Sequence, residues 1–272
     1  MKYFKNKITT LFLFSAILII ACGNNSSKEL DNKVIIANKI DSISQKNVPA
    51  KLTKLVSSYP DFLDSADENN LYWNDGTVMI YDDGIGNKTH DEMLDDPDIE
   101  DMLSQDYVKG SGWKNPPSEN FEPGRIRYEP FFLKMYGNNS GEVKNNLVNI
   151  EWVDGSSLLF SNVNGAAEKL KLVIEELLQL PSEFKKYLVR PGGTFNWRNI
   201  AGTNRLSNHS FGSAIDINTK YSNYWQWSNS LNYQNQIPVE IVDIFEKHGF
   251  IWGGKWYHYD TMHFEYRPEL IN

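Results

Sequence analysis

Residues 207–216 read SNHSFGSAID and place His209 and Asp216 seven positions apart, with Gly212 between them. A second histidine, His263, follows far downstream. Two histidines and one carboxylate form a three-ligand set that leaves zinc one open coordination position, as in catalytic rather than structural zinc sites. The sequence therefore predicts one zinc ion per chain, bound by His209, Asp216 and His263.

The glycine decides how His209 and Asp216 can meet. On one continuous strand, their odd separation would point the two side chains to opposite faces. A helix would align them, but Gly212 and the β-prone residues 214–217 argue against a helix. We therefore expect a loop that carries His209, a bend at Gly212, and a strand that presents Asp216. Ala214 would share the face of Asp216 and leave room for an ion.

A carboxylate also precedes the second histidine. Alternation of Met262, Phe264 and Tyr266 predicts a final strand whose other face carries His263, so Asp260 lies in the turn just before it. A carboxylate beside the water of a zinc site is the usual general base of a metallohydrolase. The helical zinc motif H-E-x-x-H is absent from the sequence.

The pattern S-x-H-x-x-G-x-A-x-D, met by residues 207–216, and the D-x-x-H at 260–263 resemble the zinc D-alanyl-D-alanine carboxypeptidase family. That family includes L-alanyl-D-glutamate endopeptidases of bacterial cell walls, and an aspartate at Asp260 is nearest to that branch. The resemblance implies that the two histidines and Asp216 bind zinc and that Asp260 is the catalytic base. It also implies an α+β fold of hedgehog/DD-peptidase type, with a small, mainly antiparallel sheet flanked by helices and the zinc site on its concave face.

An arginine upstream of the first ligand recurs in that family, where it polarises the scissile carbonyl or holds the substrate carboxylate. The planar, permanently charged guanidinium suits either task. Arg198 and Arg205 compete for the role. We favour Arg198, because Arg205 is close enough in sequence to pair with local backbone or a surface acid. Ser207 cannot use the neighbouring His209 as its base and has no G-x-S-x-G elbow, so we expect it to support the loop or contact substrate.

Two further residues are assigned to substrate binding. Trp256 belongs to an aromatic cluster that is equally typical of a groove lining and of core packing. His258, two residues before Asp260, is a candidate for orienting substrate or water. The remaining histidines need no metal: His90 is expected to be solvated in an acidic loop, and His248 lies at a helix C-terminus, where a cation is favoured.

The N-terminus predicts export. Three lysines precede an apolar run at residues 8–20, which is too short for a transmembrane helix and typical of a signal peptide. Residues 19–22 read IIAC and resemble a bacterial lipobox, so Cys22 is expected to be diacylated and to become the mature N-terminus. The alternative is an ordinary cleaved signal with a chance cysteine. Cys22 is the only cysteine, so the mature fold is expected to have no internal disulfide, thiolate metal site or cysteine nucleophile.

The chain divides into four expected parts: a signal peptide at 1–21, a polar tether at 22–50, an N-terminal subdomain or lid at 51–160, and the zinc metallopeptidase core at 161–272. The tether has room for a short helix near residues 34–43. Within the folded part we expect strand-turn-strand over 71–81, a loop with a short helix over 91–106, a helix over 164–180 capped by Asn164, and a helix over 238–248.

Composition limits the partners. A formal charge of −8 argues against a polyanion such as nucleic acid. Eight tryptophans suit a packed body with a stacking groove. We expect a bacterial cell-envelope lipoprotein, held at the periplasmic or outer face of a membrane, that hydrolyses peptidoglycan stem peptides as a D-alanyl-D-alanine carboxypeptidase. The alternatives are an L-alanyl-D-glutamate-type endopeptidase and a non-catalytic, zinc-containing wall-binding protein.

Overall fold

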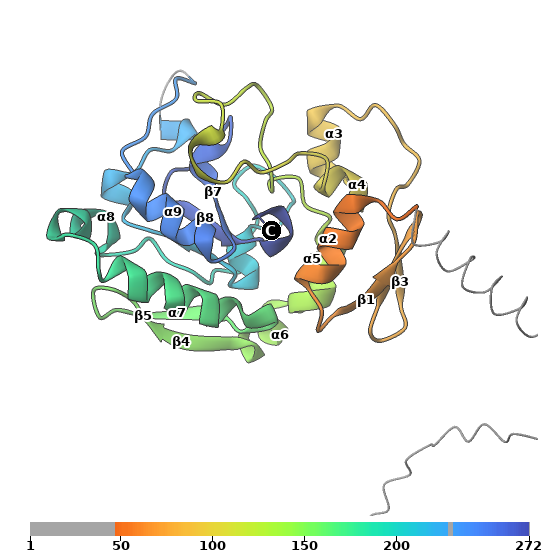
Figure 1. The fold of residues 1–272 in the computed structure, drawn as a ribbon, viewed down its shortest axis with the longest axis horizontal. Helices are drawn as coiled ribbons and strands as arrows, with labels where there is room; N and C mark the ends of the chain where they lie inside the picture. Colours follow the sequence, from red (N-terminus) through yellow and green to blue (C-terminus); the bar gives the residue numbers. More distant parts are fainter. Residues whose placement is uncertain (1–46, 228–230, 272) are drawn as a thin grey trace, which may run out of the picture. The chain divides into compact units, whose positions relative to one another are not determined.

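The computed structural model describes residues 47–227 and 231–271 and combines helices with small antiparallel sheets (Figure 1). This confirms the α+β class. Within the described ranges, no helix has the length and apolarity needed to cross a membrane. The predicted signal peptide, Cys22 and the helix expected near residues 34–43 lie outside the described residues.

The sheet that matters for the site has the strand order β6-β8-β7, with both neighbouring pairs antiparallel. Its strands are β6 (Ala214–Asp216), β7 (Phe250–Trp252) and β8 (His263–Tyr266). Strand β6 follows the bend at Gly212, and β8 is the final strand of the chain, as the sequence predicted.

The pairing of β6 with β8 separates an apolar face from a polar one. Ile215 lies opposite Phe264, and Asp216 lies opposite His263. Ile215 and Phe264 are fully buried, and Phe264 stacks on Phe245 with ring centroids 3.9 Å apart. Full burial of such a side chain contributes about 1.5–3 kcal/mol. The core therefore holds the register that sets Asp216 against His263.

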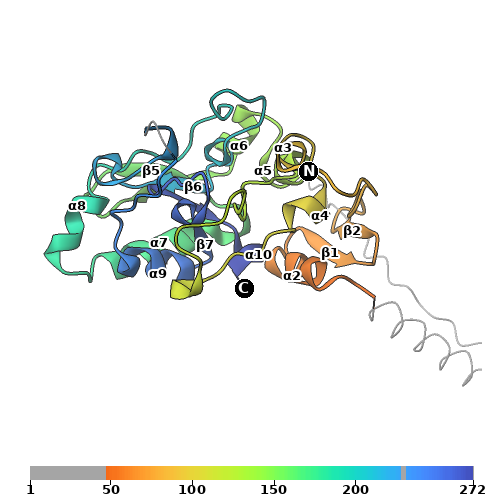
Figure 2. The same ribbon diagram turned by 90° about the horizontal axis from the view of Figure 1, so that it is seen from above.

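Two helices and a hairpin cover the apolar side of this sheet. Helix α9 (Val239–Lys247) packs against β7 and against α7 (Ala166–Leu177), and α7 packs on the hairpin of β4 (Leu147–Glu151) and β5 (Ser157–Ser161), as Figures 1 and 2 show. The sequence predicted α9 to within one residue at each end, and Pro238 is its N-cap. The hairpin was not predicted.

The start of the other predicted helix differs from the expectation. Asn164 has φ of 51°, and its side-chain amide donates to the carbonyl of Ser58. A 3-10 turn, η2 (Val163–Gly165), precedes α7, and Gly165 occupies the N-cap position without a side-chain hydrogen bond. The predicted capping role of Asn164 is wrong, because its side chain bonds to a residue that is distant in sequence.

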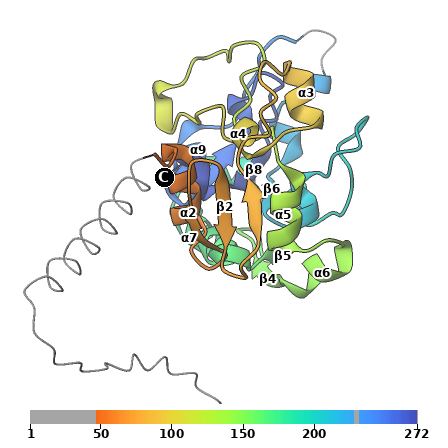
Figure 3. The same cartoon turned by 90° about the vertical axis from the view of Figure 1, so that its right-hand side faces the viewer.

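The N-terminal part forms its own sheet, with the order β1-β2-β3 (Figure 3). Strands β2 (Asn70–Trp73) and β3 (Val78–Ile80) confirm the predicted strand-turn-strand, and β1 (Leu63–Ala66) was not predicted. The helices of this part are α2 (Ala50–Ser58), α3 (His90–Asp95), α4 (Ile99–Met102), α5 (Glu129–Tyr136) and α6 (Ser140–Asn145). The acidic segment thus contains two short helices, each with a capping box, where one was expected.

The N-terminal part packs against the elements that carry the site. One core cluster contains side chains of α2, β2 and α5 together with Phe211, Ile251 and Trp256. Phe211 stacks on Phe132 of α5 with ring centroids 5.6 Å apart. Helix α2 contacts the last helix, α10 (Pro268–Ile271), which follows β8 directly. The described residues, 47–227 and 231–271, belong to one compact unit.

Candidate metal centre

Strands β6 and β8 bring together two side chains that are 47 positions apart in the sequence. Asp216 and His263 are direct cross-strand partners, and Asp216 Oδ1 lies 3.0 Å from His263 Nδ1. Directly opposed residues on antiparallel strands have Cβ atoms about 4.5–5.5 Å apart, so the two side chains share one face of the sheet. The sheet register alone therefore provides two of the three candidate ligands.

His209 reaches the same point from a single 3-10 turn, η4 (Asn208–Phe211). Gly212 ends this turn with φ of +66°, and an added Cβ there would lie 2.5 Å from Leu147 Cδ2. His209 Nδ1 is 2.5 Å from the carbonyl of Thr194. A carbonyl accepts only, so Nδ1 carries the hydrogen and Nε2 is free to bind a cation. That Nε2 lies 3.2 Å from Asp216 Oδ1.

His263 uses its two ring nitrogens in the opposite way to His209, with Nδ1 instead of Nε2 toward Asp216. Its Nε2 lies 3.0 Å from Glu265 Oε2, a fully buried carboxylate two residues further along β8. Glu265 therefore accepts the Nε2 hydrogen, and Nδ1 faces Asp216. Burial lowers the pKa of His263, but hydrogen bonds to Asp216 and Glu265 outweigh burial and raise this pKa to about 10. Without a cation, His263 thus holds a proton between the two carboxylates.

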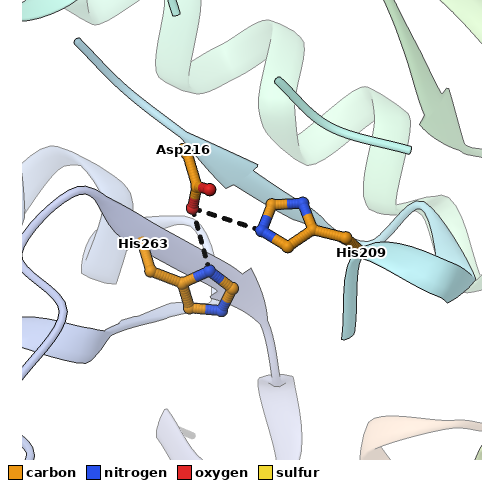
Figure 4. Close-up of side chains that lie close together, drawn as sticks. All are labelled: His209, Asp216 and His263. Atoms are coloured by element: carbon orange, nitrogen blue, oxygen red, sulfur yellow. Dashed lines mark hydrogen bonds and ion pairs between the residues drawn. The ribbon is translucent and has the colours of Figure 1, made fainter. Parts of the chain in front are cut away.

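Figure 4 shows the three side chains directed toward one another from η4, β6 and β8. One ligand atom from each of His209, Asp216 and His263 lies within 4.8 Å of the others. Burial alone would raise the pKa of Asp216, but the two histidines hold it well below its usual range. Two imidazole nitrogens and one ionised carboxylate, with each histidine held by a second hydrogen bond, are a donor set that fits zinc.

Asp260 lines the same cavity of about 330 Å³ as the three candidate ligands. Its Oδ1 is buried and has no hydrogen-bond partner among the described residues. Burial and the neighbouring Asp216 raise the pKa of Asp260 to about 6. A buried carboxylate oxygen without a partner is destabilising, so such a group marks a candidate functional residue. The place of Asp260 in the cavity lining and its raised pKa make it a candidate for proton transfer there.

Three arginines line this cavity: Arg125, Arg127 and Arg198. Arg198 is exposed, and its guanidinium donates to the carbonyl of Asn199. Arg205 does not line the cavity, and its Nε lies 3.2 Å from a carboxylate oxygen of Asp95. Of the two arginines that competed for the role in the sequence, only Arg198 lines the cavity. No role was predicted for Arg125 and Arg127, which flank the buried Ile126.

The other predicted substrate residues lie in different surroundings. Ser207 lines the cavity and caps η4, with its Oγ accepting from the His209 backbone N–H at 3.4 Å. Trp256 also lines the cavity, but it is nearly fully buried and donates to the carbonyl of Pro123. His258 is not among the lining residues, and its Nδ1 lies 2.7 Å from the buried Glu122.

His90 also contacts Glu122, because its Nε2 lies 3.0 Å from Glu122 Oε2. The expectation that His90 is solvated is therefore wrong. The segment that contains Glu122 lies more than 30 residues away in the sequence, which is why local composition did not reveal the contact.

A chain of buried polar contacts leads from the metal centre to the N-terminal part. Glu265 Oε1 accepts from Arg267 Nη1 at 3.1 Å, and Arg267 Nε donates to Glu269 at 2.5 Å. Glu269 in turn accepts from the hydroxyl of Tyr59, directly after α2, at 2.6 Å. The structure thus joins His263 to Tyr59 through three charged residues near the end of the chain.

Comparison with known families gives one finding. A family model described as D-alanyl-D-alanine carboxypeptidase matches residues 201–266, about a quarter of the chain. The matched stretch contains His209, Asp216, Asp260 and His263. No curated protein and no solved structure matches the chain. The match supports a peptidase of this family, which is generally zinc-dependent, and does not resolve the branch.

Proposed function

We propose that this protein is a zinc-dependent peptidase that hydrolyses peptide bonds in peptidoglycan stem peptides, in the manner of a D-alanyl-D-alanine carboxypeptidase. The observation that carries the proposal is the convergence of His209, Asp216 and His263 with the unpartnered carboxylate of Asp260 in one cavity. The family match over residues 201–266 supports the same class.

The chain's own residues have defined tasks in this proposal. His209 Nε2, Asp216 Oδ1 and His263 Nδ1 would hold one zinc ion, which acidifies water and polarises a carbonyl oxygen. Asp260 accepts a proton from the water that attacks the peptide carbonyl and returns it to the nitrogen of the leaving amine. Arg198 stabilises the negative charge that develops on the carbonyl oxygen.

Two alternatives differ in their products. An aspartate as the proposed base favours an L-alanyl-D-glutamate-type endopeptidase, which cuts within the stem peptide. A wall-binding protein that keeps zinc without catalysis would leave the peptide intact. The buried, unpartnered Asp260 carboxylate favours an enzyme over a binder, because a binder has no use for this destabilising group.

Purified muropeptides incubated with the zinc-loaded protein and examined by mass spectrometry test the proposal. Loss of a terminal alanine is expected. An internal cut would identify the endopeptidase, and unchanged muropeptides would reject enzymatic activity on this substrate.

We also propose that the protein is anchored in the bacterial cell envelope by a lipid on Cys22. The apolar run before this cysteine and the lipobox-like residues 19–22 support an anchor that holds the enzyme close to the cell wall. Labelling cells with a fatty-acid analogue tests this: label is expected on the full-length protein and not on Cys22→Ala. Label on both proteins would exclude this anchor.

A further inference from the structure

The cavity of about 330 Å³ that contains the three candidate ligands is called the metal cavity below. A second cavity, of about 660 Å³, adjoins it. The two cavities share Arg125 and Arg127 in their linings. Much of the lining of the larger one comes from the segment between α3 and α5, which lies before the stretch that matches the family model. The proposed activity assigns no role to this cavity.

Arg127 lies where the two cavities meet and has donor capacity to spare. Its guanidinium makes two long contacts, to the carbonyl of Gly124 at 3.4 Å and to that of Leu206 at 3.3 Å. The carboxylate that the structure pairs with it, Glu265, lies 3.8 Å away and also serves His263 and Arg267. A guanidinium has five N–H donors, so Arg127 can still bind an anion through two of them.

The charged neighbours of Arg127 are mostly positive: one carboxylate, Glu265, and three arginines. Burial lowers the pKa of Arg127 to about 10, and repulsion from Arg267, Arg125 and Arg205 opposes the attraction of Glu265. Arg125 donates to the carbonyl of His258 at 2.9 Å and has its guanidinium over the ring of Trp256. Its nearest carboxylate, the buried Glu122, lies 3.7 Å from Arg125 Nε and also contacts His90 and His258. An anion in this cavity would therefore relieve repulsion among arginines.

The acids on the lining have other partners than Arg127 or are exposed to solvent. Asp95 pairs with Arg205, and Glu129 accepts from the backbone N–H of Leu206 at 2.9 Å. Asp91 and Asp96 are exposed to water, which screens them. The larger cavity is thus lined by solvent-exposed acids and by arginines that are less exposed.

We propose that this cavity binds a free carboxylate of an acidic peptide substrate through Arg127 and Arg125, while the scissile bond lies in the metal cavity. The inference rests on the proposed peptidase function and specifies its substrate class. A carboxylate is favoured over a neutral group, because it pairs with the planar guanidinium through two parallel hydrogen bonds.

Two synthetic stem peptides test the proposal. They are identical except that the free glutamyl carboxylate of one is a carboxamide in the other. The wild-type protein is expected to hydrolyse the carboxylate peptide with a kcat/KM at least about tenfold higher. In Arg127→Gln this ratio is expected to fall toward one, mainly through KM, whereas Arg190→Gln, at an exposed arginine outside both cavities, keeps it. A wild type without preference, or Arg127→Gln with an unchanged ratio, would overturn the proposal.

A second variant and a binding measurement keep the proposal testable if Arg127→Gln does not fold or if the peptides are not hydrolysed. If Arg127→Gln does not fold by circular dichroism, Arg125→Gln is expected to lower the ratio in the same direction, and an unchanged ratio there counts against the cavity. Titration calorimetry with zinc-loaded Asp260→Asn compares the binding of the two peptides without turnover. Preferential binding of the carboxylate peptide without hydrolysis by wild type would refute the proposed function and support this subsite. Equal binding and equal hydrolysis of both peptides would support the proposed function and refute this subsite.

Discussion

Asp216 and His263 face each other directly across strands β6 and β8, with Oδ1 and Nδ1 3.0 Å apart. A shift of the strand pairing by one residue would move one of them to the core face. The apolar partners on that face, Ile215 and Phe264, oppose such a shift because both are fully buried. Hydrophobic packing on one side of the sheet therefore maintains the polar pair on the other.

Removal of one candidate ligand is expected to abolish zinc binding. Asp216→Ala leaves two histidines, so zinc content is expected to drop from about one ion per chain to near zero. Elemental analysis after gentle dialysis measures this content. His248→Gln is a matched control, because His248 bonds to Glu176 outside the site. Full zinc occupancy in Asp216→Ala would refute the assigned ligand set.

Asp260→Asn is expected to retain zinc and lose activity. The substitution keeps the size of the side chain but removes a group that can take up a proton, and general-base catalysis contributes about 10²–10⁴-fold. Rates on muropeptides and zinc content are measured on the same preparation. Activity within a few-fold of wild type would assign the base to another residue.

Glu265→Gln is expected to weaken zinc binding by about 10–100-fold, because the carboxylate no longer holds the Nε2 hydrogen of His263. The buried arginines Arg127 and Arg267 would also lose a negative neighbour, so Tm is expected to fall. Competition with a chromophoric chelator measures the affinity. Glu168→Gln, at an exposed carboxylate on α7, is the control. An unchanged affinity in Glu265→Gln would show that this contact does not orient the ligand.

Zinc uptake is expected to release a proton and to strengthen as pH rises. The raised pKa of His263, about 10, means that the metal-free site is protonated at neutral pH, and the cation must displace this proton. The apparent affinity is expected to rise about tenfold per pH unit below that pKa. Titration calorimetry in buffers of different ionisation enthalpy counts the released protons. Heats that do not depend on the buffer would contradict this expectation.

The stability of the metal-free protein is expected to fall as the pH rises, whereas the zinc affinity is expected to increase. The folded-state pKa of His263 lies above its ordinary value of about 6.5. Its contribution to stability is therefore fully present below about pH 6.5 and is lost as the pH rises toward 10. Urea unfolding of the zinc-free protein across this range measures the loss, and a stability that increased with pH would contradict it.

Gly212→Ala is expected to destabilise the protein by about 1–3 kcal/mol and to lower zinc occupancy. The residue has a positive φ, and its new Cβ would meet Leu147. Gly155→Ala is the control, because Gly155 has a similar φ of +82° with no atom nearby. The Leu147→Ala, Gly212→Ala double variant is expected to recover part of the zinc. Equal effects at both glycines would leave backbone strain as the sole cause.

The resemblance of the sequence to a known family implied the α+β class, and its local patterns predicted the position of the final strand and the candidate residues of the site. His209, Gly212 and Asp216 belong to one local motif, and alternation over residues 262–266 set the face of His263. Such short-range patterns are readable because they follow from the periodicity of the backbone. The misplaced cap at Asn164 shows their limit.

Only the tertiary structure decided the contacts between distant segments. It paired Glu265 with His263, placed Glu122 beside His90 and His258, and brought Arg125 and Arg127 to the boundary of two cavities. It also separated Arg198, in the metal cavity, from Arg205. Side-chain type and local spacing do not encode these neighbours, because long-range packing determines which buried charge meets which partner.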